Sequence, residues 1–117
     1  MQTSWEDYLK SLSPALRELR VGNPDVMKSF SGIAQGALKP QALDTKTKEL
    51  IALAISVAIR CDDCIAFHAK AAVDQGASRD EVLETLGLAI YMGEGPSVMY
   101  AGHALEAAAQ FEAERAR

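Results

Sequence analysis

The residues of this 117-residue chain that are best suited to chemistry lie in one segment, Cys61-Asp62-Asp63-Cys64-Ile65-Ala66-Phe67-His68. Its two cysteines are three positions apart, a spacing that at a helix start lets the sulfurs meet as a disulfide. Free amide N–H groups and the positive end of the helix dipole stabilise a thiolate there, and the thiolate is the nucleophilic form of cysteine. The segment therefore predicts thiol redox chemistry.

Neighbouring charged residues would modulate that chemistry. His68 is four residues after Cys64, so both lie on one helical face, and His68 could take the thiol proton or protonate a leaving oxygen. Asp62 and Asp63 act in the opposite sense, because nearby anions oppose thiolate formation. Glu49 stands on the most apolar segment. In an antiparallel hairpin it would lie about one turn, on the order of 6 Å, beyond His68, a gap that a bridging water could close. A different interhelix angle would bring the two groups closer or separate them.

The two cysteines have two other interpretations besides a redox pair. Inert buried thiols are less favoured, since the pair falls at a helix junction near a histidine. A zinc site would need Cys61, Cys64, His68 and His103, but these histidines are 35 residues apart, whereas Cys2His2 sites place them about three to five apart. We therefore expect no metal and no cofactor, and we expect His103 to be a packed or interface residue.

Composition and charge argue against several classes of protein. Hydrophobic residues make up 49% of the chain but aromatic residues only 6%, a composition that favours helices. A net charge of -4 argues against nucleic-acid binding, which needs a basic face. No segment has the basic and apolar regions of a signal peptide, and no apolar run is long enough to span a bilayer. We expect a cytoplasmic protein, in which a structural disulfide would be unusual.

The elements that position these residues are all predicted to be helices. Residues 1–20 are amphipathic, with an interruption at Pro14. Asn23 is the expected N-cap of the next helix, and Pro24 is its first residue. Gly36 and Pro40 end that helix. Asp44 is the expected cap of a helix over residues 45–60, which is apolar nearly all round and so should be buried on most sides, by this domain or by other subunits.

The second half of the chain has equally clear boundaries. A helix is predicted from Asp62 or Asp63 to Gln75, where Gly76 stops it. Ser78-Arg79-Asp80-Glu81 fits a capping box that opens a helix to Met92. Residues 93–96, Gly-Glu-Gly-Pro, should break the chain before a last helix. We expect one all-α domain over residues 1–117, a small bundle of about five to six helices with the CxxC at a helix N-terminus.

The spacing of Glu49, Cys61, Cys64 and His68 resembles the signature of the alkylhydroperoxidase D-like, carboxymuconolactone decarboxylase superfamily. The segments Cys61-Asp62-Asp63-Cys64-Ile65-Ala66-Phe67-His68-Ala69-Lys70-Ala71-Ala72 and Ile90-Tyr91-Met92-Gly93-Glu94-Gly95-Pro96-Ser97-Val98-Met99-Tyr100 resemble it too. The resemblance covers roughly residues 24–112.

The resemblance implies an all-α fold that assembles as a homo-oligomer, a trimer or hexamer, and hydroperoxide reduction at the cysteines. Cys64 would attack the peroxide, Cys61 would resolve the sulfenic acid, and His68 and Glu49 would relay protons. The electrons would come from an external dithiol or a lipoyl or thioredoxin-like donor. The peroxidase branch has a histidine where this chain has Asp63, which weakens the expectation of efficient peroxidase activity. Lactone decarboxylases of the superfamily typically lack the cysteine pair.

Three alternatives to a hydroperoxide reductase stay open. In a thioredoxin-like oxidoreductase, Leu50 to Ile59 would be a buried strand that leads into the CxxC helix, with Pro96 as a candidate cis-proline. A non-enzymatic redox-sensing or stress-linked interaction protein would use the disulfide as a switch without turnover. A carboxymuconolactone decarboxylase-type activity would not depend on the cysteines.

Overall fold

The computed structural model describes residues 4–117, and all the regular secondary structure in that range is helical. The helices are α1 (Trp5–Ser11), α2 (Ser13–Gly22), α3 (Pro24–Leu38), α4 (Thr45–Ala58), α5 (Asp62–Asp74) and α6 (Arg79–Arg115). This confirms the all-α prediction. The thioredoxin-like alternative is wrong, because its candidate strand lies in α4 and the turn after it, and residues 4–117 contain neither a strand nor a cis peptide bond.

Local capping signals account for most helix boundaries. The Asp44 carboxylate accepts the backbone N–H of Thr47 at 2.7 Å and caps α4. Ser78 and Glu81 form the predicted capping box at the start of α6. Gly76, with φ of +90°, lies directly after the C-cap of α5, in the left-handed region that glycine enters at little cost. Asn23 precedes Pro24 as expected, but its side chain makes no capping hydrogen bond.

The turn between α4 and α5 sets the position of the first cysteine. Helix α4 ends at Ala58, two residues before the predicted end. Arg60 then adopts φ of +61°, and its N–H donates to the Val57 carbonyl at 3.1 Å. The Cys61 N–H donates to the Ser56 carbonyl at 3.0 Å, which completes a Schellman motif. Cys61 is thereby tied to the end of α4 and becomes the N-cap of α5.

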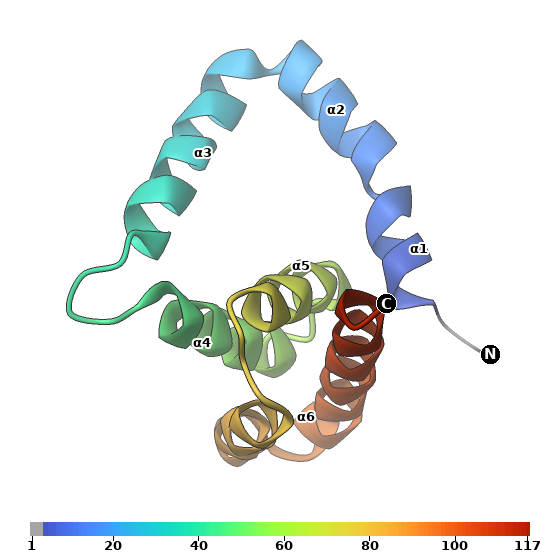
Figure 1. Cartoon of the computed structure of the whole chain (residues 1–117). Helices are drawn as coiled ribbons and strands as arrows, with labels where there is room; N and C mark the ends of the chain where they lie inside the picture. The colour runs from blue at the N-terminus through green and yellow to red at the C-terminus, as the bar shows by residue number, and fades with distance from the viewer. Residues whose placement is uncertain (1–3) are drawn as a thin grey trace.

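Helix α6 contains the break that was predicted at residues 93–96, a kink that divides it into two helical parts. Glu94 has φ of +63° and ψ of -154°, outside the helical region, and Pro96 follows it. Figure 1 shows that the two parts of α6 run in different directions. Gly93 lies close to the C-terminal end of α4, because a Cβ atom added to it would come within 3.2 Å of the Ala58 Cα. The kink thus lets both parts of α6 pack on α4.

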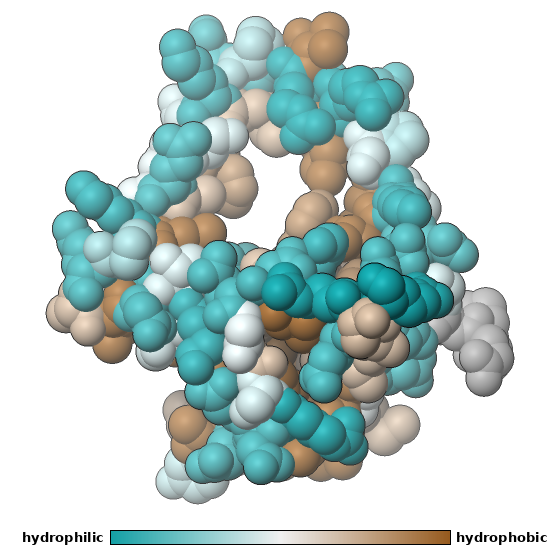
Figure 2. Space-filling view, in the orientation of Figure 1, coloured by the Kyte–Doolittle hydropathy of each residue, from teal (hydrophilic) through white to brown (hydrophobic). Residues whose placement is uncertain are grey.

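The core lies where α4, α5 and α6 pack against one another, and α1 adds Trp5 to it. Helices α2 and α3 contribute no buried residue. In Figure 1 they form an arch with α1 that begins beside α6 and returns to the three-helix body at α4. Figure 2 shows an open space between this arch and the body, with apolar side chains at its border. No helix within residues 4–117 is both long and apolar enough to cross a membrane.

Candidate active site

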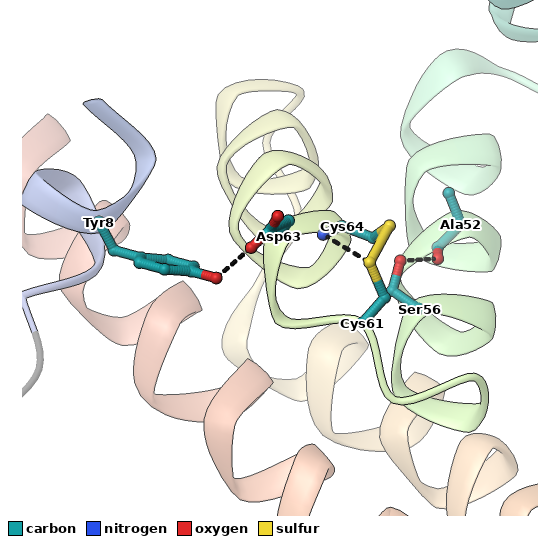
Figure 3. Close-up of a disulfide and its surroundings, with 6 residues drawn as sticks. All are labelled: Tyr8, Ala52, Ser56, Cys61, Asp63 and Cys64. Atoms are coloured by element: carbon teal, nitrogen blue, oxygen red, sulfur yellow. Dashed lines mark hydrogen bonds between the residues drawn. A yellow bond between two sulfur atoms is a disulfide. The ribbon is translucent and has the colours of Figure 1, made fainter. Parts of the chain in front are cut away.

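The two cysteines form a disulfide at the N-terminus of α5, with their Cα atoms 5.2 Å apart. Cys61 is the N-cap, and its sulfur accepts the backbone N–H of Cys64 at 3.2 Å. Both residues are half-buried. In Figure 3 the disulfide lies on the side of α5 that faces α4, beside Ser56. The arrangement directs one backbone N–H of the helix N-terminus at a sulfur, which favours negative charge on that sulfur after reduction.

Glu49 and His68 are in direct contact. Oε1 of Glu49 lies 2.7 Å from Nδ1 of His68, which joins α4 to α5. A regular antiparallel hairpin would leave a gap of about one turn between them, which a bridging water could close. The structure has the direct contact, which a different interhelix angle also allowed. Glu49 is only 5% exposed. An ionised carboxylate can only accept, so this bond places a proton on Nδ1 and leaves Nε2 as the nitrogen free to accept one.

Each aspartate between the cysteines also has a partner from another helix. The Tyr8 hydroxyl of α1 donates to Oδ1 of Asp63, and this contact raises the pKa of Tyr8 to about 12. His103 of α6 places its Nδ1 2.8 Å from Oδ1 of Asp62. Figure 3 shows Asp63 directed toward Tyr8, on the side of α5 away from the disulfide.

His103 is packed as well as hydrogen bonded. Its ring lies 5.1 Å from the ring of Tyr100 and 6.1 Å from that of Trp5, measured between centroids. The two histidines thus bond to different carboxylates, His68 to Glu49 of α4 and His103 to Asp62 of α5. Within residues 4–117 no group of three or more His, Cys, Asp or Glu side chains is placed to hold a metal ion.

Helix α1 contributes residues to the site that the sequence patterns did not indicate. Trp5 is 3% exposed, and its backbone N–H donates to the Gln110 side chain at 2.7 Å. Its ring packs edge-on against Tyr8, with centroids 5.6 Å apart. The amphipathic spacing of Trp5 and Tyr8 predicted that α1 would pack against another part of the protein. Nothing in the spacing indicated that the surface would include the CxxC segment.

Several large apolar side chains near the kink of α6 stay exposed in the single chain. Tyr91, Met92 and Met99 are 79%, 73% and 68% exposed. They are not part of the core of this chain.

Comparisons with known proteins agree with this fold. The sequence profile of the carboxymuconolactone decarboxylase family matches residues 24–109. An uncharacterized protein of Cupriavidus necator is 36% identical over 105 residues, which cover 90% of this chain and 93% of that protein.

Two solved structures are similar over nearly the whole chain. A carboxymuconolactone decarboxylase family protein from Legionella pneumophila, crystallised in its apo form, has 49% identity and a TM-score of 0.90, and the match covers 92% of this chain and 96% of that one. A family protein from Thermotoga maritima, with a suggested part in an antioxidative response, has 28% identity and a TM-score of 0.83, with 93% of each chain covered. On the profile match and these likenesses, the chain belongs to the carboxymuconolactone decarboxylase family.

Proposed function

We propose that the protein is a thiol-dependent peroxidase that reduces hydroperoxides through the Cys61–Cys64 dithiol, with Glu49 and His68 as its proton relay. The observation that carries the proposal is a disulfide at a helix N-terminus, one helical turn from a histidine whose Nδ1 contacts a buried carboxylate. A carboxylate that fixes the tautomer of an imidazole is the arrangement by which enzymes prepare histidine for proton transfer.

The first half of the reaction oxidises Cys64. Nε2 of His68 takes the proton of the Cys64 thiol, and the thiolate attacks one oxygen of the hydroperoxide. The O–O bond breaks, Cys64 becomes a sulfenic acid, and the departing alkoxide takes the proton from His68 and leaves as the alcohol. Glu49 stabilises the imidazolium that exists between the two proton transfers.

The second half closes and reopens the disulfide. The Cys61 sulfur attacks the Cys64 sulfenic acid, the S–O bond breaks, and the hydroxyl group leaves as water with the Cys61 proton. An external dithiol then reduces the disulfide and is itself oxidised, with a lipoyl or thioredoxin-like protein as the proposed donor. If the donor attacks Cys64, Cys61 departs as a thiolate, and the N–H that its sulfur already accepts assists that departure.

The suggested antioxidative role of the Thermotoga maritima protein is consistent with this activity. The family name favours a second candidate, a carboxymuconolactone decarboxylase-type reaction. That reaction does not require the two cysteines, so the cysteine variants separate the two candidates.

The test measures consumption of an organic hydroperoxide with dithiothreitol, dihydrolipoamide or reduced thioredoxin as electron donor. Wild type is compared with Cys64→Ser and Cys61→Ser, a matched pair because each removes one of the only two thiols in the chain. We expect Cys64→Ser to abolish turnover. We expect Cys61→Ser to form one sulfenic acid per chain that dimedone traps, because the resolving thiol is absent.

Three outcomes would overturn the proposal. Equal turnover in wild type and Cys64→Ser would exclude Cys64 as the nucleophile. Oxidation of the pair by peroxide without steady-state turnover with any of the three donors would indicate a redox-sensing interaction protein. Release of carbon dioxide from a lactone substrate in a variant without both cysteines would indicate a decarboxylase.

A further inference from the structure

Two carboxylates lie between the cysteines and a third contacts His68 one turn further along α5, and each of the three has a side-chain partner on another helix. The pairs are Glu49 with His68, Asp62 with His103, and Asp63 with Tyr8. Because like charges near a thiol oppose its ionisation, these carboxylates decide how readily the thiolate forms. Asp63 matters most among them, since it directly precedes Cys64 in the chain.

The Tyr8 hydroxyl determines where the Asp63 charge lies. Asp63 is exposed and stands on the first turn of α5, so its side chain has little packing of its own to select one rotamer. The bond from Tyr8 holds its carboxylate on the face of α5 away from the sulfurs, as Figure 3 shows. Tyr8 itself is held in place, because its ring packs edge-on against the buried ring of Trp5.

We propose that Tyr8 is a positioning residue of the redox site, which holds the Asp63 carboxylate away from Cys64 so that the Cys64 thiolate can form. The role rests on the proposed thiol chemistry of this site and extends it to α1, a helix 50 residues away in the sequence. It also explains how the chain tolerates an aspartate beside its nucleophile. The other titratable groups around Cys64 are Asp62 and His68 on α5, Glu49 on α4, and His103 on α6 through Asp62.

The test measures the alkylation rate of Cys64 by iodoacetamide as a function of pH, in a Cys61→Ser chain that keeps only this thiol. The pKa of Cys64 is read from the midpoint of the rate curve. We expect Tyr8→Phe to raise that pKa by about half a unit to one unit, because the released carboxylate can approach the sulfur. Below the midpoint, alkylation would then be about three- to tenfold slower.

A second substitution separates positioning from packing. Tyr8→Phe keeps the ring that contacts Trp5, and Asp63→Asn removes the charge that Tyr8 restrains. We expect Asp63→Asn to restore the parent alkylation rate in the Tyr8→Phe chain and to change it much less when Tyr8 is intact. Tyr91→Phe is the matched control, because Tyr91 is 79% exposed on α6, and it should leave the rate unchanged.

The proposal is overturned if Tyr8→Phe leaves the pKa of Cys64 unchanged, or if Asp63→Asn fails to reverse its effect. A large acceleration of Cys64 alkylation by Asp63→Asn in a chain with Tyr8 intact would also overturn it. That variant changes only an exposed side chain. The measurement needs no peroxide turnover. An absence of turnover with the expected alkylation rates would therefore reject the peroxidase proposal and leave the role of Tyr8 intact.

Discussion

At the scale of single residues, the pairing of Glu49 with His68 places the Glu49 carboxylate in a position nearly closed to solvent. A buried carboxylate is costly unless it is hydrogen bonded, so the 2.7 Å contact with Nδ1 of His68 stabilises the fold as well as orienting the ring. The same contact makes Nε2 of His68 the only ring nitrogen available for proton transfer. Structure and proposed chemistry therefore depend on one hydrogen bond.

Glu49→Gln should separate these two contributions. The glutamine carbonyl can still accept from Nδ1, so we expect the fold to persist, but the charge that stabilises the imidazolium is lost. Peroxide turnover should fall by about 100-fold or more. The comparison is with Glu84→Gln, which removes an exposed carboxylate on α6 and should change neither turnover nor melting temperature. Unchanged turnover in Glu49→Gln would exclude the relay.

Ionisation of Tyr8 gives a pH-dependent prediction. Its pKa is raised from 10.0 to about 12 in the folded chain, first by the hydrogen bond to Asp63 and then by burial. The contribution of this bond to stability is complete below pH 10, where the hydroxyl is protonated in both states, and is lost as the pH rises through about 12. Tyrosinate absorbance should show a transition near pH 12 that is missing from Tyr8→Phe. If Tyr8→Phe instead removed a transition near pH 10, the assignment of the raised pKa to Tyr8 would be contradicted.

At the scale of elements, the site depends on how closely α6 approaches the end of α4. Gly93 allows that approach, because an added Cβ atom would overlap the Ser97 side chain and come within 3.2 Å of the Ala58 Cα. Ser97 is fully buried at this contact. The turn that follows Ala58 carries Cys61, so the packing of the α6 kink supports the start of the CxxC segment.

Gly93→Ala should therefore destabilise the protein by about 1–3 kcal/mol, the cost of overpacking a close contact. Gly87→Ala is the matched control on the same helix, where an added Cβ meets nothing within 4 Å. Replacing a helix-interior glycine in open space should stabilise by about 0.4–1 kcal/mol. Chemical denaturation measures both values, and equal stability of the two variants would show that the close approach is not limiting.

At the scale of the whole molecule, the arch of α2 and α3 lacks a core of its own. Neither helix buries a residue in the single chain, although Val26, Phe30 and Ile33 form an apolar stripe on α3 at 57%, 62% and 67% exposure. Ile51 and Ile55 of α4, and Ile59 directly after it, are also exposed by 45–63%. Helices of this length are marginal in water without packing, so the predicted homo-oligomer would supply the missing contacts.

Phe30→Asp tests this expectation. We expect the wild type to sediment as more than one chain, and we expect the charged side chain on the apolar stripe to shift the protein toward a single chain. Gln35→Asp adds the same charge on the opposite side of α3 and should leave the mass unchanged. A wild type that sediments as one chain would contradict the prediction of an oligomer.

Features that depend on residues close together in the chain could be predicted from the sequence. Asp44, Gly76 and the Ser78–Glu81 capping box marked helix ends, because capping bonds join residues at most three or four positions apart. The same range explains why Cys61 and Cys64 could be expected to pair at a helix start.

Which side chains meet across helices depends on tertiary packing. Glu49 and His68 are 19 residues apart, His103 and Asp62 are 41 apart, and Tyr8 and Asp63 are 55 apart. Their contacts depend on interhelix angles and on the packing of Trp5, which no local spacing encodes. The sequence therefore permitted a relay between Glu49 and His68 but did not establish the direct bond that is found. The partners of the two aspartates were not foreseen, because contacts at such separations are determined by the packing of the whole core.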